Sequence, residues 1–209
     1  MFIADVGGGA MHAVIGILAE LVRRGRDGAG ASLDISMHEA ALYWVMLPAA
    51  RELVHSGHQA TGELPTFGRH ASYNVYRTRD GQHLALGALE AKFWAAFCEA
   101  VGRPDLVGRH HTGEADQTAL IDEVRALFAS RTSAEWLAHF EAHDVCLTPV
   151  NQPADALRDR HVQARGAVLD IPGGRAIRPP FVRHMPPLGP PPAVGEHTEE
   201  VIEELRNED

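Results

Sequence analysis

The strongest constraint on the fold is a pair of alternating segments joined by a four-residue turn. Residues 73–78 and 83–88 alternate between apolar and polar side chains, and Arg79-Asp80-Gly81-Gln82 lies between them. Asp-Gly between two such segments is typical of a tight antiparallel hairpin. Residues 90–101 follow with the apolar period of a helix, which Gly102-Arg103-Pro104 closes. The sequence therefore predicts a mixed α/β fold in which helices cover a small sheet.

The remaining elements are expected from the same periodicities and from turn residues. Further helices are predicted at residues 10–24, 37–54 (interrupted near Pro48), 116–130, 134–143, 153–159 and 196–205, and further strands at residues 32–36, 146–150 and 165–171. Gly25 is the expected C-cap of the first helix, and Thr132 with Glu135 has the pattern of a capping box.

Composition divides the chain into four segments. Residues 1–54 are interpreted as the remainder of a larger domain, because they lack the strands that a self-contained doubly wound fold needs. Residues 55–71 are rich in Gly, His, Thr and Pro and are expected to be a linker. Residues 72–165 are expected to form a small α/β domain. Residues 166–209 are expected to contain a proline-rich return segment and a last helix, and residues 172–195 should run over a surface without regular structure.

Charge and cysteine content limit the classes of partner and compartment. The 209 residues carry a net charge of -9, which argues against nucleic acid as the main partner. The two cysteines, Cys98 and Cys146, are isolated and fit a reducing compartment. The N-terminus has no signal-peptide pattern, and the longest apolar stretch, at residues 14–22, is too short to span a bilayer. We therefore expect a soluble, cytoplasmic protein that does not enter a membrane.

A carboxylate and three glycines stand just ahead of the first predicted helix. Asp5 lies beside the positive end of the helix dipole, which favours its ionised form. The backbone N–H groups of Gly7, Gly8 and Gly9 are open to approach and could hold a developing oxyanion. Asp5 would then be a base or a nucleophile beside an oxyanion site. Spacing alone favours the simpler interpretation, in which Asp5 caps the helix and the glycines form a tight turn.

Glu90 is the second candidate site residue. It follows the apolar strand at residues 83–89 and opens a helix, and such junctions frequently carry functional groups. The simpler interpretation is that its charge complements the helix dipole.

Metal and cofactor sites find little support in the sequence. The 13 histidines are scattered, and the pair His139 and His143 lacks a third ligand, so no metal is expected. The aromatic residues on the predicted helices are more consistent with a core than with a cofactor site. They are Phe93, Trp94, Phe97, Trp136 and Phe140.

Several segments, in this order, resemble the class III CoA-transferase family, of the carnitine and bile-acid CoA-transferase type. The segments are residues 3–9, 28–37, 73–81, 87–94, 148–150, 161–166, 188–189 and 195–198. Gly87-Ala88-Leu89-Glu90 is similar to a segment of the branch that includes the 2-methylacyl-CoA racemases. The resemblance covers nearly the whole chain, but only the family's C-terminal part.

The resemblance implies a fold and a class of substrate. Family members process acyl-CoA thioesters without a metal or redox cofactor, so coenzyme A enters as part of the substrate. They form interlocked dimers of chains with a large Rossmann-like domain and a smaller α/β domain. The N-terminal Rossmann-like half and the racemase histidine are expected to be missing here. The chain is therefore expected to form an interlocked homodimer or to pair with a chain that supplies that half.

The resemblance also implies roles for two residues. In the transferases the aspartate matching Asp5 attacks the thioester, and in the racemases it works with a histidine to move the α-proton. The glutamate matching Glu90 lines the racemase site. Three hypotheses follow: racemisation of a 2-methylacyl-CoA with Asp5 and Glu90, CoA transfer between carboxylic acids through Asp5, and a non-catalytic remnant or assembly subunit.

Overall fold

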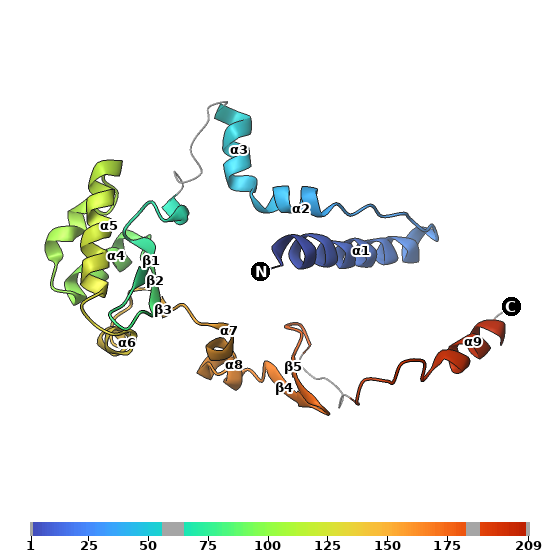
Figure 1. The fold of residues 1–209 in the computed structure, drawn as a ribbon. Coiled ribbons are helices and arrows are strands. Elements are labelled where there is room, and N and C mark those ends of the chain that lie inside the picture. Colours follow the sequence, from blue (N-terminus) through green and yellow to red (C-terminus); the bar gives the residue numbers. More distant parts are fainter. Residues whose placement is uncertain (1, 56–64, 183–188, 208–209) are drawn as a thin grey trace. The chain divides into compact units, whose positions relative to one another are not determined.

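The computed structural model describes residues 2–55, 65–182 and 189–207. Contacts divide the chain into two units, Met1–Thr148 and Pro149–Asp209, and each is described by itself (Figure 1). The central part of the predicted linker, residues 56–64, lies outside the described residues, as does Leu188 of the segment at residues 188–189.

The first helix is longer than the sequence predicts. A π-helix, η1 (Ile3–Ala10), continues directly into α1 (Met11–Asp27), so Asp5 and the three glycines lie inside a helix and not ahead of it. The end also differs, because Gly28 and not Gly25 adopts the left-handed conformation, with φ of 76°. Its N–H donates to the Arg24 carbonyl over 2.8 Å. Arg24 and Arg26 lie in the last turn, where their charge complements the helix dipole.

Two shorter helices follow. Ser36 caps α2 (Met37–Trp44) by accepting a hydrogen bond from the Glu39 N–H, and α3 (Met46–His55) begins after a break at Val45. The predicted interruption is therefore present but precedes Pro48. Proline is tolerated in the first turn of a helix, where its missing N–H has no helical partner, and Pro48 lies in the first turn of α3.

The strand predicted at residues 32–36 is absent. Within the described ranges these residues form no ladder with another segment. Instead, the Leu33 and Ile35 side chains lie over Gly16 of α1, at 3.5 and 3.7 Å from the position of a Cβ built there. An extended segment becomes a strand only when a neighbouring strand shares its hydrogen bonds, and alternation in the sequence does not supply that neighbour.

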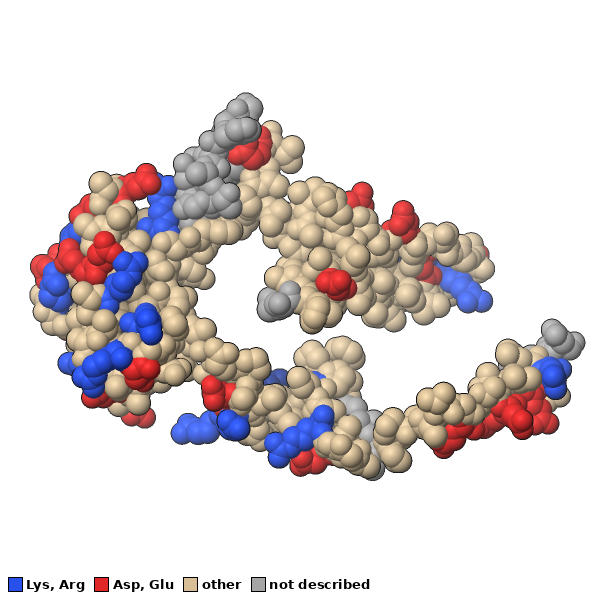
Figure 2. All heavy atoms as spheres, viewed as in Figure 1, with Lys and Arg blue, Asp and Glu red and all other residues tan. Residues whose placement is uncertain are grey.

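The N-terminal helix exposes a large apolar surface. Ile3–Asp27 spans 25 residues with a window of mean hydropathy 1.4, long and apolar enough to cross a membrane by length and composition alone. The sequence-based expectation considered only the shorter stretch at residues 14–22. A helix that packs against protein passes the same test, and Figure 2 shows few charged side chains over this part of the chain. The absence of a membrane span stays a prediction.

The predicted hairpin is confirmed and forms part of a three-stranded sheet. Strands β1 (Tyr73–Arg77) and β2 (His83–Gly87) are antiparallel, with Tyr73 opposite Gly87 and Arg77 opposite His83. The sheet order is β1-β2-β3, where β3 is Leu147–Pro149. Gly81 in the turn has φ of 79°, a conformation that glycine adopts without steric cost.

Helices cover the sheet and enclose an aromatic core. They are α4 (Ala91–Ala100), the 3-10 helix η4 (Pro104–Arg109), α5 (Glu114–Phe128) and α6 (Ser133–Phe140), and a 3-10 helix η3 (Pro65–Phe67) precedes β1. The capping box of Thr132 and Glu135 is present at the start of α6. The core contains stacked rings such as Tyr76 on Phe128, at 5.0 Å between centroids. Its largest buried side chains are Trp94, Trp136, Tyr76, Phe97, Phe128, Leu84, Leu86, Leu106 and Leu120.

The second unit is a chain of short elements. They are α7 (Pro153–Ala156), α8 (Arg160–Ala164), β4 (Val168–Ile171), β5 (Gly174–Ile177) and α9 (Thr198–Asn207). The expectation that residues from 172 onward wander over a surface is wrong at its start, because Gly174–Ile177 pairs antiparallel with Val168–Ile171. Gly173, with φ of 87°, makes the turn. Residues 183–188 lie outside the described part of this segment.

Candidate functional site

Asp5 is exposed in the first turn of a π-helix. π-Helices are rare, and they occur frequently at functional sites. Three consecutive glycines also have low helix propensity, so tertiary contacts must hold this segment in its helical form. An exposed carboxylate at the start of such a helix is available to a ligand.

The glycines allow η1 and α2 to approach closely. A Cβ at Gly9 would lie 3.0 Å from the Met37 Cγ, and one at Gly8 would lie 3.4 Å from the Ala40 Cβ. Gly8 is buried, and Gly7 lies under the Trp44 ring, 3.6 Å from the position of its absent Cβ. The absence of side chains at these glycines therefore allows η1 to pack closely against α2. The N–H groups that lack helical partners are those at the very start of a helix, and the three glycines lie further along η1. Their oxyanion role stays a prediction.

A histidine on α1 supports the π-helix. The His12 Nδ1 lies 2.9 Å from the Gly7 carbonyl oxygen. Since a carbonyl only accepts, the ring nitrogen is the donor. The shifted hydrogen-bond pattern of a π-helix depends on such local partners, and sequence reasoning did not single out this contact.

Glu90 occupies the N-cap position of α4. Its backbone is extended, with φ of -79° and ψ of 141°, and its side chain makes no capping hydrogen bond. The carboxylate is exposed at the strand-to-helix junction, as the sequence predicts. The absence of a cap bond means that helix capping does not account for a glutamate here, although its charge still favours the start of a helix.

A shallow depression of about 290 Å³ lies on the open face of the three-stranded sheet. Its lining includes Tyr73, Val75, Gly87, Cys146 and Thr148. Cys146 has φ of 51°, and its carbonyl accepts a hydrogen bond from the Gly87 N–H over 2.9 Å.

Glu90 follows Gly87, one of the residues that line this depression, by three positions in the sequence. Loss of part of its solvent to the surrounding protein, and then the negative charges of Asp144 and Glu90, raise the pKa of the exposed Cys146 thiol above its ordinary value. Asp5 and Glu90 belong to different parts of the chain, so each is placed only within its own surroundings. The structure therefore gives two exposed carboxylates, one in a π-helix and one beside an open depression.

The expectation of no metal site stays a prediction. Among them, no group of three or more His, Cys, Asp or Glu side chains is arranged to hold a metal ion. The His139 and His143 ring centroids are 6.1 Å apart, and the His139 Nε2 lies 2.8 Å from the Ala100 carbonyl oxygen. His139 thus has a structural partner.

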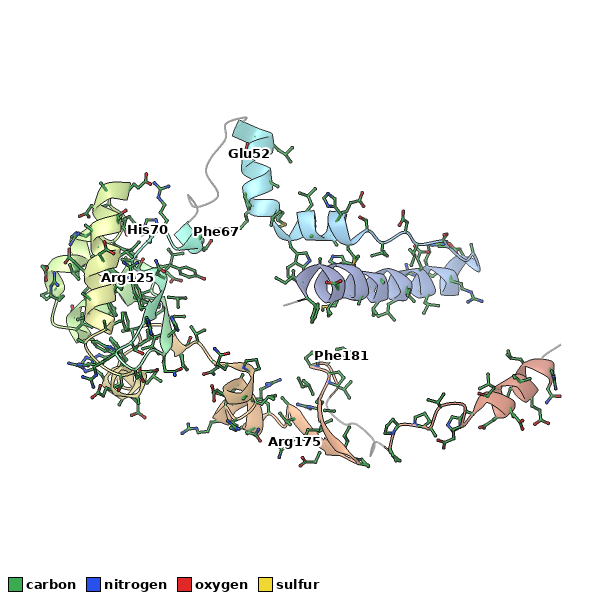
Figure 3. The ribbon with its side chains drawn as sticks, viewed as in Figure 1. Glu52, Phe67, His70, Arg125, Arg175 and Phe181 are labelled. Atoms are coloured by element: carbon green, nitrogen blue, oxygen red, sulfur yellow. The ribbon has the colours of Figure 1, made fainter. Side chains whose placement is uncertain are left out.

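Sequence reasoning missed a cluster of three histidines in the small domain. His70, His110 and His111 come from two segments about forty residues apart in the sequence, and their rings are in contact. No spacing rule links them, because the fold brings the end of the linker to the end of η4. Figure 3 labels His70 where the chain enters the small domain.

Comparisons with known proteins find racemases and CoA-transferases among the relatives of this chain. Alpha-methylacyl-CoA racemase from Mus musculus is 31% identical over 210 residues, which cover 97% of this chain and 54% of the racemase. Succinyl-CoA:glutarate CoA-transferase from Mus musculus is 26% identical, over 90% of this chain and 46% of the transferase. The chain thus spans about half the length of the curated relatives it matches.

Solved structures share the fold. The crystal structure of a CAIB/BAIF family protein from Brucella suis has a TM-score of 0.73 and 21% identity, covering 95% of this chain and 54% of that protein. At this identity the likeness shows the fold alone. The model of the CoA-transferase family III matches residues 1–198. The chain belongs to the CoA-transferase family III.

Proposed function

We propose that this chain carries the reactive aspartate and a site-lining glutamate of an enzyme that racemises or epimerises a 2-methylacyl-CoA. The observation that carries the proposal is the position of Glu90. Its uncapped carboxylate lies in the segment Gly87-Ala88-Leu89-Glu90, beside the open depression that Gly87 and Cys146 line. The first curated relative, 31% identical, is named a racemase of this substrate class.

The reaction requires a base for the α-proton of the thioester. Asp5 accepts this proton, the electron pair of the C–H bond moves toward the thioester carbonyl, and an enolate forms. Return of the proton from Asp5 to the same face restores the substrate. Delivery of a proton to the opposite face needs a second acid, which is a histidine in the family's racemases, and gives the epimer. Coenzyme A remains attached throughout, and no metal or redox cofactor takes part. Glu90 lines the site beside the reacting carbon.

Deuterium incorporation tests this proposal directly. The chain is incubated with a 2-methylacyl-CoA in heavy water, and α-deuterium is measured by mass spectrometry. We expect Asp5→Asn to slow exchange by roughly 10²–10⁴-fold, the usual contribution of a positioned base. Asp34→Asn is the matched control, because Asp34 is also an exposed aspartate of the N-terminal segment.

Glu90 needs a separate comparison. Glu90→Gln is expected to slow exchange, whereas Glu99→Gln removes an exposed carboxylate of the same helix and leaves the rate unchanged. Exchange that persists at the wild-type rate in Asp5→Asn would refute the assignment of the base.

CoA transfer between carboxylic acids is a second candidate. Its support is the similarity to succinyl-CoA:glutarate CoA-transferase together with the exposure of Asp5. In this reaction the Asp5 carboxylate displaces the CoA thiolate from an acyl-CoA and forms a mixed anhydride. The thiolate then attacks the Asp5 carbonyl, which forms an aspartyl-CoA thioester and releases the first acid. The same two steps in reverse with a second carboxylate give the new acyl-CoA and return the free Asp5 carboxylate. Hydroxylamine added during turnover would leave a hydroxamate on Asp5, detectable by peptide mass spectrometry. A chain that forms no adduct with several acyl-CoAs is not such a transferase.

The exposed helices support pairing with another chain. We propose an interlocked homodimer, or a complex with a chain that carries the N-terminal half of the fold, in a cytoplasmic compartment. Several apolar side chains of α1 are more than half exposed, and a contiguous apolar surface of this kind marks a contact region. They are Val14, Ile15, Leu18, Leu21 and Val22. A chain that pairs in this way but shows neither exchange nor adduct would be an assembly subunit.

A further inference from the structure

A buried histidine outside the predicted site contacts the segment around Glu90 from two sides. His110 directly follows η4 and is 7% exposed. Its Nε2 lies 3.2 Å from the carbonyl oxygen of Ala88, two residues before Glu90. Its ring stacks on Trp94, four residues after Glu90, with centroids 5.7 Å apart and planes 9° apart. Glu90 therefore lies between two contacts made by one ring.

The contact with Ala88 fixes where the ring carries its proton. A carbonyl oxygen accepts and cannot donate, so the hydrogen bond requires a proton on the His110 Nε2. In the neutral ring the Nδ1 then carries none. A phenyl ring at this position would keep the stacking on Trp94 and lose the hydrogen bond.

Neighbouring contacts hold both partners of His110 in place. The Ala88 N–H donates to the Ser72 carbonyl over 2.8 Å, and the Trp94 Nε1 donates to the Leu106 carbonyl over 3.1 Å. The carbonyl of His110 itself accepts from the Gln117 Nε2 over 3.2 Å. Because its backbone is anchored on α5, His110 can fix the end of β2 and the start of α4 relative to the rest of the domain.

We propose that His110 is a positioning residue for Glu90, and that its neutral ring, protonated on Nε2, holds the segment from Ala88 to Trp94. This role rests on the proposed function, because that function alone gives the Glu90 carboxylate a chemical task. The ring is buried, and we assign it no contact with the substrate. It determines where the backbone that carries Glu90 lies.

The two neighbouring histidines make this contact sensitive to pH. The His111 ring centroid is 3.8 Å from that of His110 and 5.4 Å from that of His70. Burial and the proximity of His111 lower the pKa of both His70 and His110 below the ordinary histidine value. The His70 Nδ1 is buried and has no hydrogen-bond partner among the described residues.

The charged groups around the cluster do not offset a positive charge on these rings. Arg69 acts on His70 in the same direction as His111. The Arg109 guanidinium, next to His110, is paired with Asp116 and Glu123. The residues that contact His110 from the end of β2, from α4 and from α5 carry no charge. They are Ala88, Trp94 and Gln117. Protonation of the cluster therefore brings like charges together, while the hydrogen bond to the Ala88 carbonyl by itself favours the protonated His110 ring. We expect repulsion from His111 and His70 to displace the His110 ring as the pH falls below the histidine range.

Nuclear magnetic resonance of the chain tests the proposal without substrate. Long-range ¹⁵N correlations report the tautomer of each histidine, and we expect the Nε2–H form for His110 at pH 8. The amide resonances of Leu89 and Glu90 should shift with pH together with the His110 ring. In His110→Phe this pH dependence should disappear. The Ala88 amide, which donates to the Ser72 carbonyl, should exchange with solvent about two- to tenfold faster, because its segment loses the one hydrogen bond at the Ala88 carbonyl.

Two further variants separate positioning from general stabilisation. His110→Gln places an amide donor near the position of Nε2 and should restore slow exchange at Ala88 without restoring the pH dependence. His139→Gln is the matched control, because the His139 ring makes an equivalent contact with the Ala100 carbonyl elsewhere in the domain. It should leave the Leu89 and Glu90 resonances and their pH dependence unchanged.

The opposite results would overturn the proposal. A His110 ring protonated on Nδ1 alone, or Leu89 and Glu90 resonances that titrate identically in His110→Phe and in the wild type, would exclude the positioning role. Because these measurements need no acyl-CoA, a chain that shows the contact but no α-proton exchange would refute the proposed reaction and not the role of His110.

Discussion

Replacing Gln117 with leucine should destabilise the small domain more than any surface substitution. Gln117 is 1% exposed on α5 and joins three segments. Its Oε1 accepts the Ala71 N–H over 3.1 Å, and its Nε2 donates to the carbonyls of Arg109 and His110 over 2.7 and 3.2 Å. Nε2 also donates to the Thr112 hydroxyl over 3.1 Å. Leucine has a similar size, so the change removes hydrogen bonds and leaves little cavity.

The expected loss of unfolding free energy depends on what each hydrogen-bond partner of Gln117 loses. Ala71 is fully buried, so its N–H would lose its acceptor without gaining water. Such a group costs about 1–3 kcal/mol. Arg109 and Thr112 are only partly buried, so water can replace part of their loss. We therefore expect the free energy of unfolding to fall by about 2–4 kcal/mol.

Urea unfolding monitored by tryptophan fluorescence measures this change, because Trp94 and Trp136 lie in the core of the same domain. Gln82→Leu, at an exposed glutamine of the hairpin turn, is the control and should change the free energy of unfolding by no more than about 0.5 kcal/mol. A loss below about 1 kcal/mol in Gln117→Leu, with an unchanged denaturant slope, would show that the buried amide is not the link that the hydrogen bonds indicate.

Three further outcomes follow from individual groups. The pKa values of His70 and His110 are lowered in the folded chain, so the unfolded chain binds more protons, and stability should begin to fall as the pH drops below about 6.5. Thermal melts between pH 8 and 5 measure this fall. His110→Phe should reduce the dependence of the melting temperature on pH. Cys98 is fully buried and its pKa is raised to about 12, whereas Cys146 is exposed. Mass spectrometry after alkylation of the native chain at pH 8 should therefore find a single modified thiol. Two modified thiols would contradict the burial of Cys98. Thr132→Ala removes the capping box of α6 and should cost about 1 kcal/mol in urea unfolding, while Thr132→Ser should retain most of it.

Local patterns predicted much of the small domain. The Asp80-Gly81 turn, the helix that follows Glu90 and the capping box at Thr132 depend on residues close in the sequence, and each is present in the structure. The family also follows from the sequence, because its segments occur in order along the chain. Glu90 was predicted to lie at the junction of a strand and a helix, and it does.

Contacts between distant residues decided what sequence reasoning did not. Glycines predict a loop, yet Gly7, Gly8 and Gly9 are helical because α2 packs against them, and a side chain at Gly9 would push Met37 away. The alternation at residues 32–36 predicts a strand, but none forms because no neighbouring strand is present among the described residues.

The surroundings of Glu90 show the same division. The strand period and the helix start, which are visible in the sequence alone, placed Glu90 between β2 and α4. Only the tertiary structure brought His110 to the Ala88 carbonyl and Gln117 to the Ala71 N–H, across 22 and 46 residues of sequence. Periodicity and turn chemistry act over a few residues, whereas a buried polar group takes its partner from whichever segment the packing of the core places beside it.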